Sequence, residues 1–471
     1  MRIKSITIEN LFGNNQRYHL ELLTPNGVTI VHAQNGMGKT TILSMIPAIL
    51  NIDVAYLLSI PFKSACIILE NETIICVAKI SDSINKKTMN NVGDGSFFEY
   101  MDYEALEKIN YRVENGIKYS IIQPHGKKLD CIVCLHSKYS NQMNRILAYA
   151  EAFGETKTQI RRGYTFLHFD NKEFRSVFDN LTRDISVNFI KTDRLWISES
   201  EVKRDKGRGL VTDQKEQESE AKVEAITECA MDLLERIYAA KREKEDVSEA
   251  LDRSFPKRLI ELYKSKERAD VHVVRNHLRE LERIREELEN IGLVGEENER
   301  VTFSFDEWLP ASAQPVLEIY IEDSKKKLQV YDKIKKQINL LLKAINVSNA
   351  FINKKLEIVT SGPDYAMRFV SIDGREIPLE KLSSGEKHAV IMFYNLIFKS
   401  KEGALVMIDE PEISLHISWQ QHFITSLLEI CKENGLNAVV ATHSPDIVND
   451  HWDLLVNLDG TSINDDPDEE E

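Results

Sequence analysis

Apolar and polar residues alternate along the first part of the chain, and this pattern predicts short β-strands. The alternation covers residues 1–32, where turn-forming asparagine, proline and glycine separate the apolar runs. Two further runs with strand character follow at 65–69 and 73–78, and another lies at 186–190. Residues 141–152 have the spacing of a helix. We therefore predict a β-rich N-terminal part that also contains helices.

The middle of the chain has a different pattern, in which apolar residues recur three and four positions apart, as along one side of a helix. This pattern predicts one helix from about residue 215 to Pro256, a second that ends at Ile291 before Gly292, and a third over residues 317–345. Helices of this length suit an antiparallel coiled-coil arm, although a helical domain packed on the rest of the protein fits the same pattern. The seam positions are Val223, Ile226, Ala230, Leu233 and Ile237, then Val274, His277, Leu281, Ile284, Leu288 and Ile291, then Leu317, Ile321, Ser324, Leu328, Tyr331, Lys335, Ile338, Leu342 and Ile345.

Strand patterns return after Val347, where Asp373 and Gly374 form a turn signal between two strand-like runs. The helical block therefore reads as an insertion that divides one α/β domain into two sequence halves. We expect an N-terminal lobe over residues 1–212, a helical insertion over 213–347 and a C-terminal lobe over 348–458. The composition of the acidic tail, residues 459–471, is typical of solvated, disordered segments.

Composition places the chain among ordinary globular proteins and weighs against two classes of function. Of its 471 residues, 29% are charged and 42% are hydrophobic, and the net charge is -15. An acidic protein does not bind nucleic acid through bulk charge, but the local basic clusters at 161–162 and 203–208 leave DNA binding open. No run of about 18 apolar residues is present, and residues 1–6 read as a strand. We therefore expect a cytoplasmic protein without a membrane segment.

The cysteines do not point to a disulfide framework, because there are only six in a chain of this length. Cys131 and Cys134 form a CxxC pair close to His136, but no second pair lies at the spacing of a zinc site. The pair is either a redox or metal site or two positions on a buried strand. The apolar residues around it favour the strand.

The stretch from Ala33 to Thr40 has the layout of a phosphate-binding loop. An apolar run precedes it and a predicted helix over 40–50 follows it. Glycines allow the backbone amides to turn inward, and the helix start favours an anion at the same place. The lysine then supplies a charge for the β- and γ-phosphates, and the threonine supplies a hydroxyl for Mg²⁺. The residues predicted to bind ATP here are Asn35, Gly36, Met37, Gly38, Lys39, Thr40 and Thr41, with Ala33 in place of the usual first glycine.

Three stretches in the second half of the chain complete a nucleotide site. Ser383, Ser384, Gly385 and Glu386 open an apolar helix, and such a helix start binds anions. Asp409 and Glu410 end an apolar strand, where carboxylates suit Mg²⁺ and the activation of water. His443 ends a third apolar strand, where it can hydrogen-bond the γ-phosphate. We predict that Glu410, His443 and Lys39 are catalytic and that Thr40 and Asp409 hold Mg²⁺.

The order of these motifs resembles the ATP-binding-cassette (ABC) ATPases of the SMC, RecF and OLD group, whose two lobes are also separated in sequence by a helical arm. The resemblance implies an α/β, P-loop ATPase head of the ABC type, split by an inserted coiled-coil arm. It identifies Lys39 and Thr40 with the Walker A loop, Asp409 and Glu410 with Walker B, and His443 with the switch histidine. It also implies that residues 383–386 are the signature motif, which in that family acts on ATP held by a second protomer. Ser414, Leu415 and His416 match the D-loop, and Gln123 and Gln142 are two candidates for the glutamine loop.

Residues 382–387 and 412–416 are most similar to the ATPases of bacterial antiphage defence. OLD-type nucleases carry a TOPRIM domain, and the chain ends too soon after His443 to hold one, so we expect a separate effector. The resemblance implies an AriB-like TOPRIM nuclease, as in PARIS systems with AriA-type ATPases, or an HNH nuclease, as in Septu systems with PtuA-type ATPases. It further implies a toxin-antitoxin-like sensor, homo-oligomeric and slow in ATP hydrolysis with Mg²⁺, that releases its nuclease when a phage protein triggers it.

Two other functions fit parts of the sequence. A DNA-repair ATPase of the RecF or RecN type would bind duplex DNA through basic residues such as those at 161–162 and 203–208. A structural scaffold with a degenerate site is disfavoured, because Lys39, Asp409, Glu410 and His443 are all present.

Overall fold

The structure is a computed structural model, and its contacts divide the chain into two compact units. The first unit comprises Met1–Ile190, Lys401–Pro411 and Leu427–Glu471, and the second comprises Lys191–Ser400 and Glu412–Ser426. The structure describes residues 1–32, 37–80, 116–124, 126–135, 167–169, 171–190, 196–198, 222–264, 271–294, 313–346, 351, 353–360, 366–458 and 461–462. The predicted helix at 141–152 and the basic clusters at 161–162 and 203–208 lie outside these residues.

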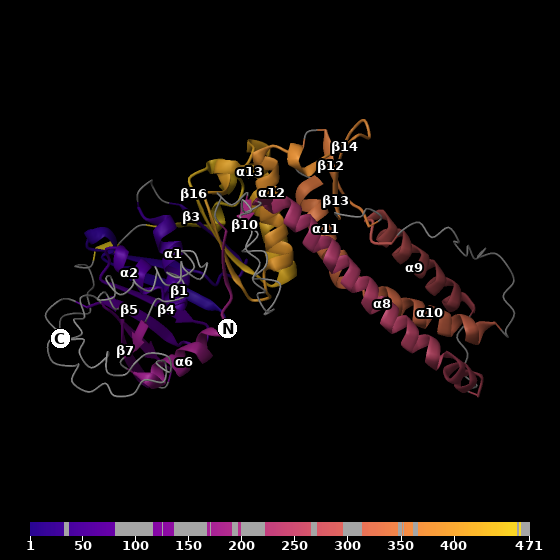
Figure 1. Ribbon diagram of the computed structural model, residues 1–471, viewed down its shortest axis with the longest axis horizontal. Helices are drawn as coiled ribbons and strands as arrows, with labels where there is room; N and C mark the ends of the chain where they lie inside the picture. Colours follow the sequence, from indigo (N-terminus) through magenta and orange to yellow (C-terminus); the bar gives the residue numbers. More distant parts are fainter. Residues whose placement is uncertain are drawn as a thin grey trace, which may run out of the picture. The chain divides into compact units, whose positions relative to one another are not determined.

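A five-stranded parallel sheet forms the centre of the first unit (Figure 1). Its order is β17-β3-β16-β15-β9, so strands from both ends of the sequence lie side by side in one sheet. The inner strands are continuous apolar runs because both faces of a parallel sheet are covered. The bounds are β3 (Val28–His32), β9 (Val187–Ile190), β15 (Leu405–Asp409), β16 (Asn437–Thr442) and β17 (Leu455–Asn457).

An antiparallel sheet of eight strands is the second layer of this unit, in the order β18-β2-β1-β4-β5-β6-β7-β8. Its inner strands alternate between buried and half-buried residues, which confirms the strands predicted from alternation. The bounds are β1 (Ile3–Glu9), β2 (Gln16–Glu21), β4 (Ser64–Leu69), β5 (Ile74–Lys79), β6 (Gly116–Ile122), β7 (Lys128–Leu135), β8 (Leu167–Phe169) and β18 (Thr461–Ser462).

Helix α1 (Lys39–Leu50) joins the two sheets through one hydrophobic core. Its residues Ile42, Met45 and Ile46 are at most 2% exposed and pack with buried residues of both sheets. This burial holds the start of α1 in place, because apolar area removed from water stabilises the helix at about 25 cal/mol per Å². Helices α2 (Val54–Ser59) and α6 (Lys172–Thr182) contact the antiparallel sheet, and α14 (Pro445–Val448) follows β16.

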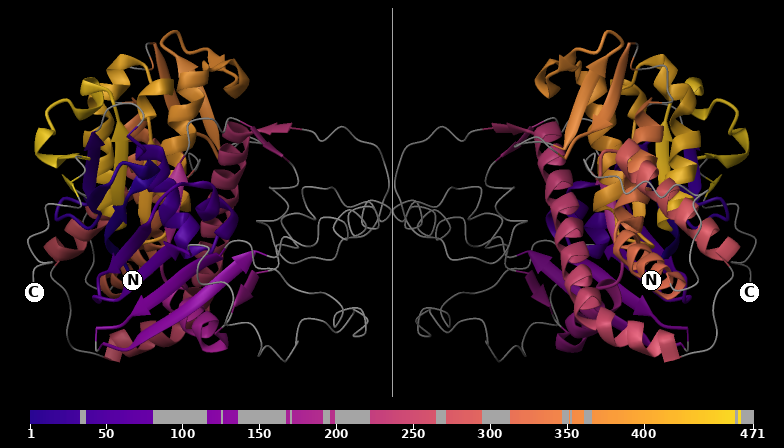
Figure 2. Two further views of the ribbon diagram at one scale, coloured as in Figure 1. Left: turned by 90° about the vertical axis from the view of Figure 1, so that its left-hand side faces the viewer. Right: turned by 90° about the vertical axis from the view of Figure 1, so that its right-hand side faces the viewer.

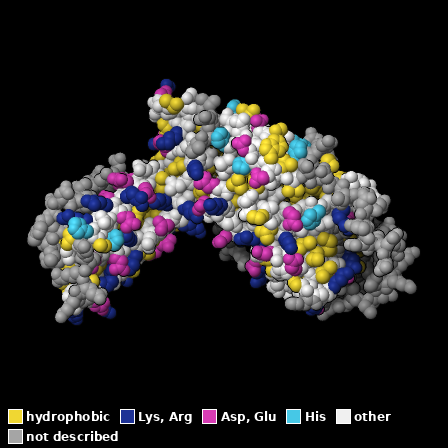
Figure 3. Space-filling model, turned by 180° about the vertical axis from the view of Figure 1, so that it is seen from behind, with side chains coloured by type: hydrophobic (Ala, Val, Ile, Leu, Met, Phe, Trp, Pro, Cys, Tyr) yellow, Lys and Arg dark blue, Asp and Glu magenta, His cyan; other side chains and the backbone are white. Residues whose placement is uncertain are grey.

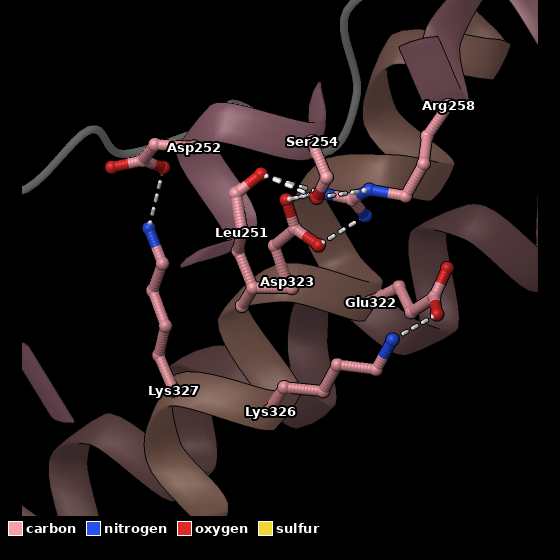
Figure 4. A network of polar contacts seen from close by, with 8 residues as sticks. All are labelled: Leu251, Asp252, Ser254, Arg258, Glu322, Asp323, Lys326 and Lys327. Atoms are coloured by element: carbon pink, nitrogen blue, oxygen red, sulfur yellow. Dashed lines mark hydrogen bonds and ion pairs between the residues drawn. The ribbon is translucent and has the colours of Figure 1, made fainter. Parts of the chain in front are cut away.

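The second unit contains the predicted helical insertion, and one expected break in it is wrong. Helix α8 (Ala225–Lys264) continues through Pro256, as Figure 2 shows. In the turn before the proline, Ser254 and Arg258 donate to the Leu251 carbonyl at 3.0 and 2.9 Å (Figure 4). Arg258 also holds both carboxylate oxygens of Asp323, at 2.6 and 2.8 Å. A proline costs roughly 3 kcal/mol inside a helix, and these contacts stabilise the helix on both sides of it.

The remaining helices of the insertion are α9 (Val271–Asn290), α10 (Gln314–Gln329) and α11 (Asp332–Asn346). The predicted third helix is thus two helices, separated at Val330 and Tyr331. Helix α10 packs on both α8 and α9, and Gly292, at φ +73°, ends α9 as predicted.

Two of the predicted seam positions are wrong. In the second helix His277 is exposed and the neighbouring Leu278 is buried in its place. Val223 lies in the strand β11 (Lys222–Glu224), which pairs with β10 (Trp196–Ser198), and not in the first helix.

A small antiparallel sheet and a buried helix complete the second unit. The sheet consists of β12 (Lys354–Ile358), β13 (Met367–Ser371) and β14 (Glu376–Ile377), and the predicted turn at Asp373-Gly374 joins the last two. Helix α12 (Ser384–Tyr394) continues into a π-helical turn at Asn395–Lys399. Helix α13 (Ile417–Asn434) contributes residues to both units. The predicted α/β class with an inserted helical block is confirmed.

The cysteines are distributed differently from expectation. Cys66 and Cys76, on β4 and β5, face each other and form a disulfide that we did not predict. Cys131 is buried on β7, and Cys134 lies on the same strand, so the CxxC pair belongs to a strand as favoured. Among the described residues there is no group of three metal-binding side chains and no helix long and apolar enough to span a membrane.

Candidate functional site

Three of the predicted motifs meet at the carboxyl edge of the parallel sheet. The strand β3 leads into the phosphate loop, β16 ends before His443, and β15 ends at Asp409. Since β16 pairs with both β3 and β15 in parallel, their carboxyl ends lie side by side. The strand that carries the histidine therefore lies between the strands that carry the lysine loop and the two acids. Ligands of open α/β sheets bind at this edge.

Lys39, His443 and Glu410 are in direct contact. The Lys39 side chain is buried, with 6% of the residue exposed, and its Nζ lies 3.1 Å from His443 Nδ1 and also contacts Nε2. His443 Nε2 lies 3.6 Å from Glu410 Oε1. The lysine, histidine and glutamate thus form a continuous row of polar groups across three strands. The side chains of the histidine and the glutamate are partly exposed to solvent. This row can bind an anion at one end and accept a proton at the other.

Glu410 has an unusual backbone conformation. Its φ of 47° lies in the left-handed region, which residues other than glycine and asparagine rarely adopt. The Glu410 amide donates to the Ala441 carbonyl at 2.8 Å, which anchors the turn to the neighbouring strand. Outliers of this kind concentrate at functional sites, where the surrounding structure holds them in place.

The start of α1 is open to a ligand. Its N-cap is Gly38, at φ 88°, and no side chain caps the first turn, which also contains no acidic residue. The first amides of a helix have no intrahelical acceptor, so they remain available to an anion. Thr40 is exposed, and Met37 and Thr41 are half-buried. The other predicted loop residues, Asn35 and Gly36, lie outside the described part of the chain.

Phe12 is a candidate site residue that the sequence did not suggest. It lies in the turn between β1 and β2, is 48% exposed and has a left-handed φ of 58°. Its amide donates to the Pro61 carbonyl at 2.8 Å. A Cβ built on Gly38 would meet Phe12 Cε2 at 2.8 Å, so the ring lies against the end of the phosphate loop. A larger residue at Gly38 would have to displace this ring, and an exposed aromatic side chain beside a phosphate loop suits a nucleobase.

The predicted signature residues form the first turn of α12 in the second unit. Ser383 is the N-cap, and its hydroxyl accepts from the Glu386 amide at 3.3 Å. The Glu386 carboxylate accepts from the Ser383 amide at 2.8 Å, which completes a capping box. Ser383 and Ser384 are exposed, and Gly385 and Glu386 are half-buried.

The Glu386 carboxylate is charged in this turn. Burial raises its pKa, but hydrogen bonds from Lys354 and from the Ser383 amide lower it more, so the pKa lies below the usual value of 4.5. A carboxylate with this pKa is ionised at neutral pH. The turn therefore combines amides that favour an anion with one fixed negative charge.

The predicted D-loop also lies in the second unit. Gln420, on α13, donates to the carbonyls of Leu415 and Glu412 at 3.0 and 3.3 Å and so fixes this loop on its helix. His416 and Ile413 are exposed, at 66% for the isoleucine. Of the two glutamine-loop candidates, Gln123 lies in the turn between β6 and β7, and Gln142 lies outside the described residues.

The donor set at the sheet edge fits a magnesium ion. Asp409 supplies a carboxylate at the end of β15, and Thr40 supplies an exposed hydroxyl at the start of α1. Magnesium prefers such oxygen ligands and usually keeps several waters, so two protein oxygens suffice. When bound with ATP, the ion neutralises charge on the phosphates.

The comparison with known protein families agrees with this geometry. A family model described as an AAA ATPase domain matches residues 1–448. The chain belongs to this ATPase family. It is accordingly an ATPase that uses ATP with Mg²⁺, and the α/β, P-loop class predicted from the motifs is confirmed. The family match does not assign the roles of individual residues.

The other comparisons add little to the description of this ATPase. No curated protein matches it. It is similar to the Smc head domain with an extended coiled coil bound to the C-terminal domain of ScpA from Pyrococcus furiosus, at 12% identity and a TM-score of 0.35 over 98% of this chain and 94% of that one. It is also similar to the SmcHead bound to the C-winged helix domain of ScpA, at 9% identity and a TM-score of 0.36 over 97% and 94%. Scores this low do not establish a common function.

Proposed function

We propose that this ATPase is a nucleotide-operated switch whose site is the row of Lys39, His443 and Glu410. The observation that carries the proposal is their contact across three adjacent parallel strands. Lys39 binds the β- and γ-phosphates, and the open amides at the start of α1 hold the same anion. Asp409 and Thr40 hold the magnesium ion, and the residues at 35–38 and Thr41 line the phosphates.

In this proposal Glu410 is the general base. It orients a water molecule toward the γ-phosphate and accepts its proton, and His443 donates a hydrogen bond to the γ-phosphate. Because Lys39 and Glu410 both contact His443, the histidine can respond to both the phosphate and the base. Phe12 offers its exposed ring to the nucleobase.

A second protomer completes the site in our proposal. Ser383, Ser384, Gly385 and Glu386 bind the phosphates of ATP that another copy of the chain holds, as the motif resemblance implies. ATP would then lie between protomers, and oligomerisation becomes part of turnover. The proposed organisation is an N-terminal lobe at 1–212, a helical insertion at 213–347, a C-terminal lobe at 348–458 and an acidic tail at 459–471.

The biological role that we propose is that of a sensor in antiphage defence. The ATPase holds a separate nuclease, of the AriB-like TOPRIM type or alternatively of the HNH type, and releases it when a phage protein binds. The support is the form of the signature and D-loop motifs, which resemble those of the AriA-type and PtuA-type ATPases. ATP-dependent closure would change the affinity for the nuclease.

Substitution of the proposed base tests the site. Glu410→Gln keeps the shape of the side chain but cannot accept the proton, so we expect ATP affinity within about twofold of wild type and at least a 100-fold loss of turnover. Phosphate release and ATP titration calorimetry measure the two quantities. Glu402→Gln changes an exposed glutamate of the same unit and should leave both unchanged. Normal turnover by Glu410→Gln would refute the assignment of the base.

The role in defence requires a different experiment. The tagged chain is purified together with the product of its neighbouring gene, with and without Lys39→Ala, and the complexes are weighed by mass photometry. A large complex that contains a nuclease and dissociates in the variant supports the sensor. An isolated oligomer without a nuclease would contradict it.

DNA repair in the manner of RecF or RecN remains the second candidate, but no described residue favours it. Its predicted basic clusters lie outside the described part of the chain. Figure 3 shows acidic and basic side chains interspersed on one face of the molecule. Along α9 and α10 such side chains form ion pairs, for example Lys326–Glu322 and Lys325–Glu280. Salt-dependent DNA binding by an isolated oligomer would favour this alternative.

A further inference from the structure

A lysine from another element of the second unit forms an ion pair with the capping box of α12. Lys354 Nζ lies 2.8 Å from Glu386 Oε1 and 3.0 Å from Oε2, so the ammonium group contacts both carboxylate oxygens. The side chains are only 27% and 16% exposed. Charge-assisted hydrogen bonds with this geometry are roughly twice as strong as neutral ones. Lys354 and Glu386 are separated by 32 residues, and the contact joins β12 to the first turn of α12.

The Glu386 carboxylate has two opposite effects on phosphate binding at this turn. Its carboxylate fixes the Ser383 amide and stabilises the helix start. The same negative charge lies three residues from the N-cap and repels an incoming phosphate. Lys354 compensates that charge, while the amides of Ser384 and Gly385 precede the first intrahelical bond, from the Lys387 amide to the Ser383 carbonyl. The Ser383 hydroxyl accepts from the Glu386 amide at 3.3 Å.

The strand that carries Lys354 is itself pinned at its centre. The side chain of Asn346, the last residue of α11, accepts from the Leu356 amide at 2.8 Å and donates to the Leu356 carbonyl at 3.0 Å. Leu356 is fully buried, and β12 pairs with β13 along its whole length. The backbone at Lys354 is therefore fixed, and only the lysine side chain has to be ordered when it contacts Glu386.

We propose that Lys354 is a positioning residue that makes the start of α12 competent to bind the phosphates of ATP held by a second protomer. The inference rests on the proposed function, because it presumes that the signature turn acts on ATP. It adds that Lys354 works through the charge of Glu386. A neutral residue in place of Lys354 would leave an uncompensated carboxylate at the anion site, and neutralising Glu386 as well would remove the need for the lysine.

The test measures ATP-driven association in full-length chain that carries Glu410→Gln, so that ATP persists. Analytical ultracentrifugation with ATP and Mg²⁺ gives the dissociation constant of the oligomer, and a fluorescent ATP analogue gives the affinity of each protomer. Lys354→Met should weaken association about tenfold, because the uncompensated Glu386 carboxylate repels the phosphates of the second protomer, and should leave the affinity of the protomer for ATP unchanged. Lys354→Arg, which keeps the charge, should associate nearly as well as the parent.

The decisive comparison is the double variant Lys354→Met with Glu386→Gln. A glutamine can still accept from the Ser383 amide, so this variant should regain association to within about threefold of the parent. Lys355→Met alters the exposed neighbour on the same strand and serves as the matched control. Melting temperatures exclude misfolding as the cause.

Three outcomes would overturn the inference. Undiminished association of Lys354→Met would show that the lysine has no part in it. A double variant as weak as Lys354→Met would show that the lysine acts as a structural support and not through the charge of Glu386. If the parent binds ATP without any ATP-driven association, the second-protomer role of α12 fails, and the inference fails with it. Failure of the parent to bind ATP at all would instead refute the proposed site at Lys39.

Discussion

Helices α1 and α12 each begin at a turn that we assign to nucleotide phosphates, but the two turns are built differently. The start of α1 has Gly38 as its N-cap, no side-chain cap and no acid in its first turn. The start of α12 has a complete capping box and a carboxylate paired with Lys354. The first turn depends on a ligand or water to satisfy its amides, whereas the second satisfies part of its own.

This difference suggests how the work is divided between the two turns. An uncapped turn with a buried lysine beside it gains most from an anion, so it should bind ATP in the isolated protomer. A turn that is already capped and nearly neutral gains less stabilisation from a bound anion. It should therefore add affinity for ATP only when the phosphates are already held elsewhere. In our proposal the first turn then sets nucleotide affinity, and the second sets association.

Removal of Lys39 should have the largest effect on the first turn. Hydrogen bonds to charged groups contribute about 1.5–3 kcal/mol, so Lys39→Ala should lower ATP affinity about 100-fold. Titration calorimetry with ATP and Mg²⁺ measures the change. Lys401→Ala, at an exposed position of the same unit, should bind ATP like wild type. Equal affinities for the two variants would show that the phosphates bind elsewhere.

Gly38→Ala should have the next largest effect and tests the uncapped turn itself. Alanine at φ 88° costs about 1–2 kcal/mol, and its Cβ would also meet Phe12 Cε2 at 2.8 Å and Leu11 Cδ2 at 3.0 Å. We expect ATP affinity to fall at least tenfold. Gly13→Ala shares the backbone strain, at φ +76°, but has nothing within 4 Å, so it should lose stability and keep ATP affinity. A similar loss of affinity in both variants would show that the contact with Phe12 is irrelevant.

Tyr394→Phe examines the other end of α12 and should change stability alone. The Tyr394 hydroxyl donates to Asp232 on α8 at 2.5 Å, and Asp232 keeps a second partner in Arg236. The loss should be about 1 kcal/mol, or about 2–4 °C in the melting temperature. ATP-driven association should be unchanged, unlike in Lys354→Met. Tyr238→Phe, at a tyrosine that is 42% exposed on α8, should change neither quantity, and a loss of association in Tyr394→Phe would contradict the division of roles.

The acid dependence of the capping box should give the smallest effect. Because the pKa of Glu386 is lower in the folded protein than its usual 4.5, the carboxylate stabilises the fold above about pH 4.5 and loses this contribution as the pH falls through its folded pKa. Wild type should therefore melt about 3 °C above Glu386→Gln at pH 7, and the gap should shrink below pH 4.5. A gap that is the same at pH 7 and pH 4 would contradict the role of the charge.

Much of this architecture was predictable because it depends on neighbours in sequence. The apolar runs that became β3, β15 and β16 are buried almost throughout, as such runs predict. Asp373-Gly374 produced the expected hairpin, and Gly292 ended its helix. In contrast, Pro256 did not end α8. A local rule failed at a place where Arg258 bonds to Leu251 and also to Asp323, 65 residues away on another helix.

The sequence by itself determined the class of the fold and the chemistry of the site. Backbone geometry gives strands and helices periods of two and 3.6 residues, and the motifs name the groups that bind phosphate. Only the tertiary structure decided that the strand of His443 lies between those of Lys39 and Glu410. The same holds for the contacts of Phe12 with Gly38 and of Lys354 with Glu386. These arrangements depend on hydrogen bonds and packing between segments far apart in the chain, for which no local pattern exists.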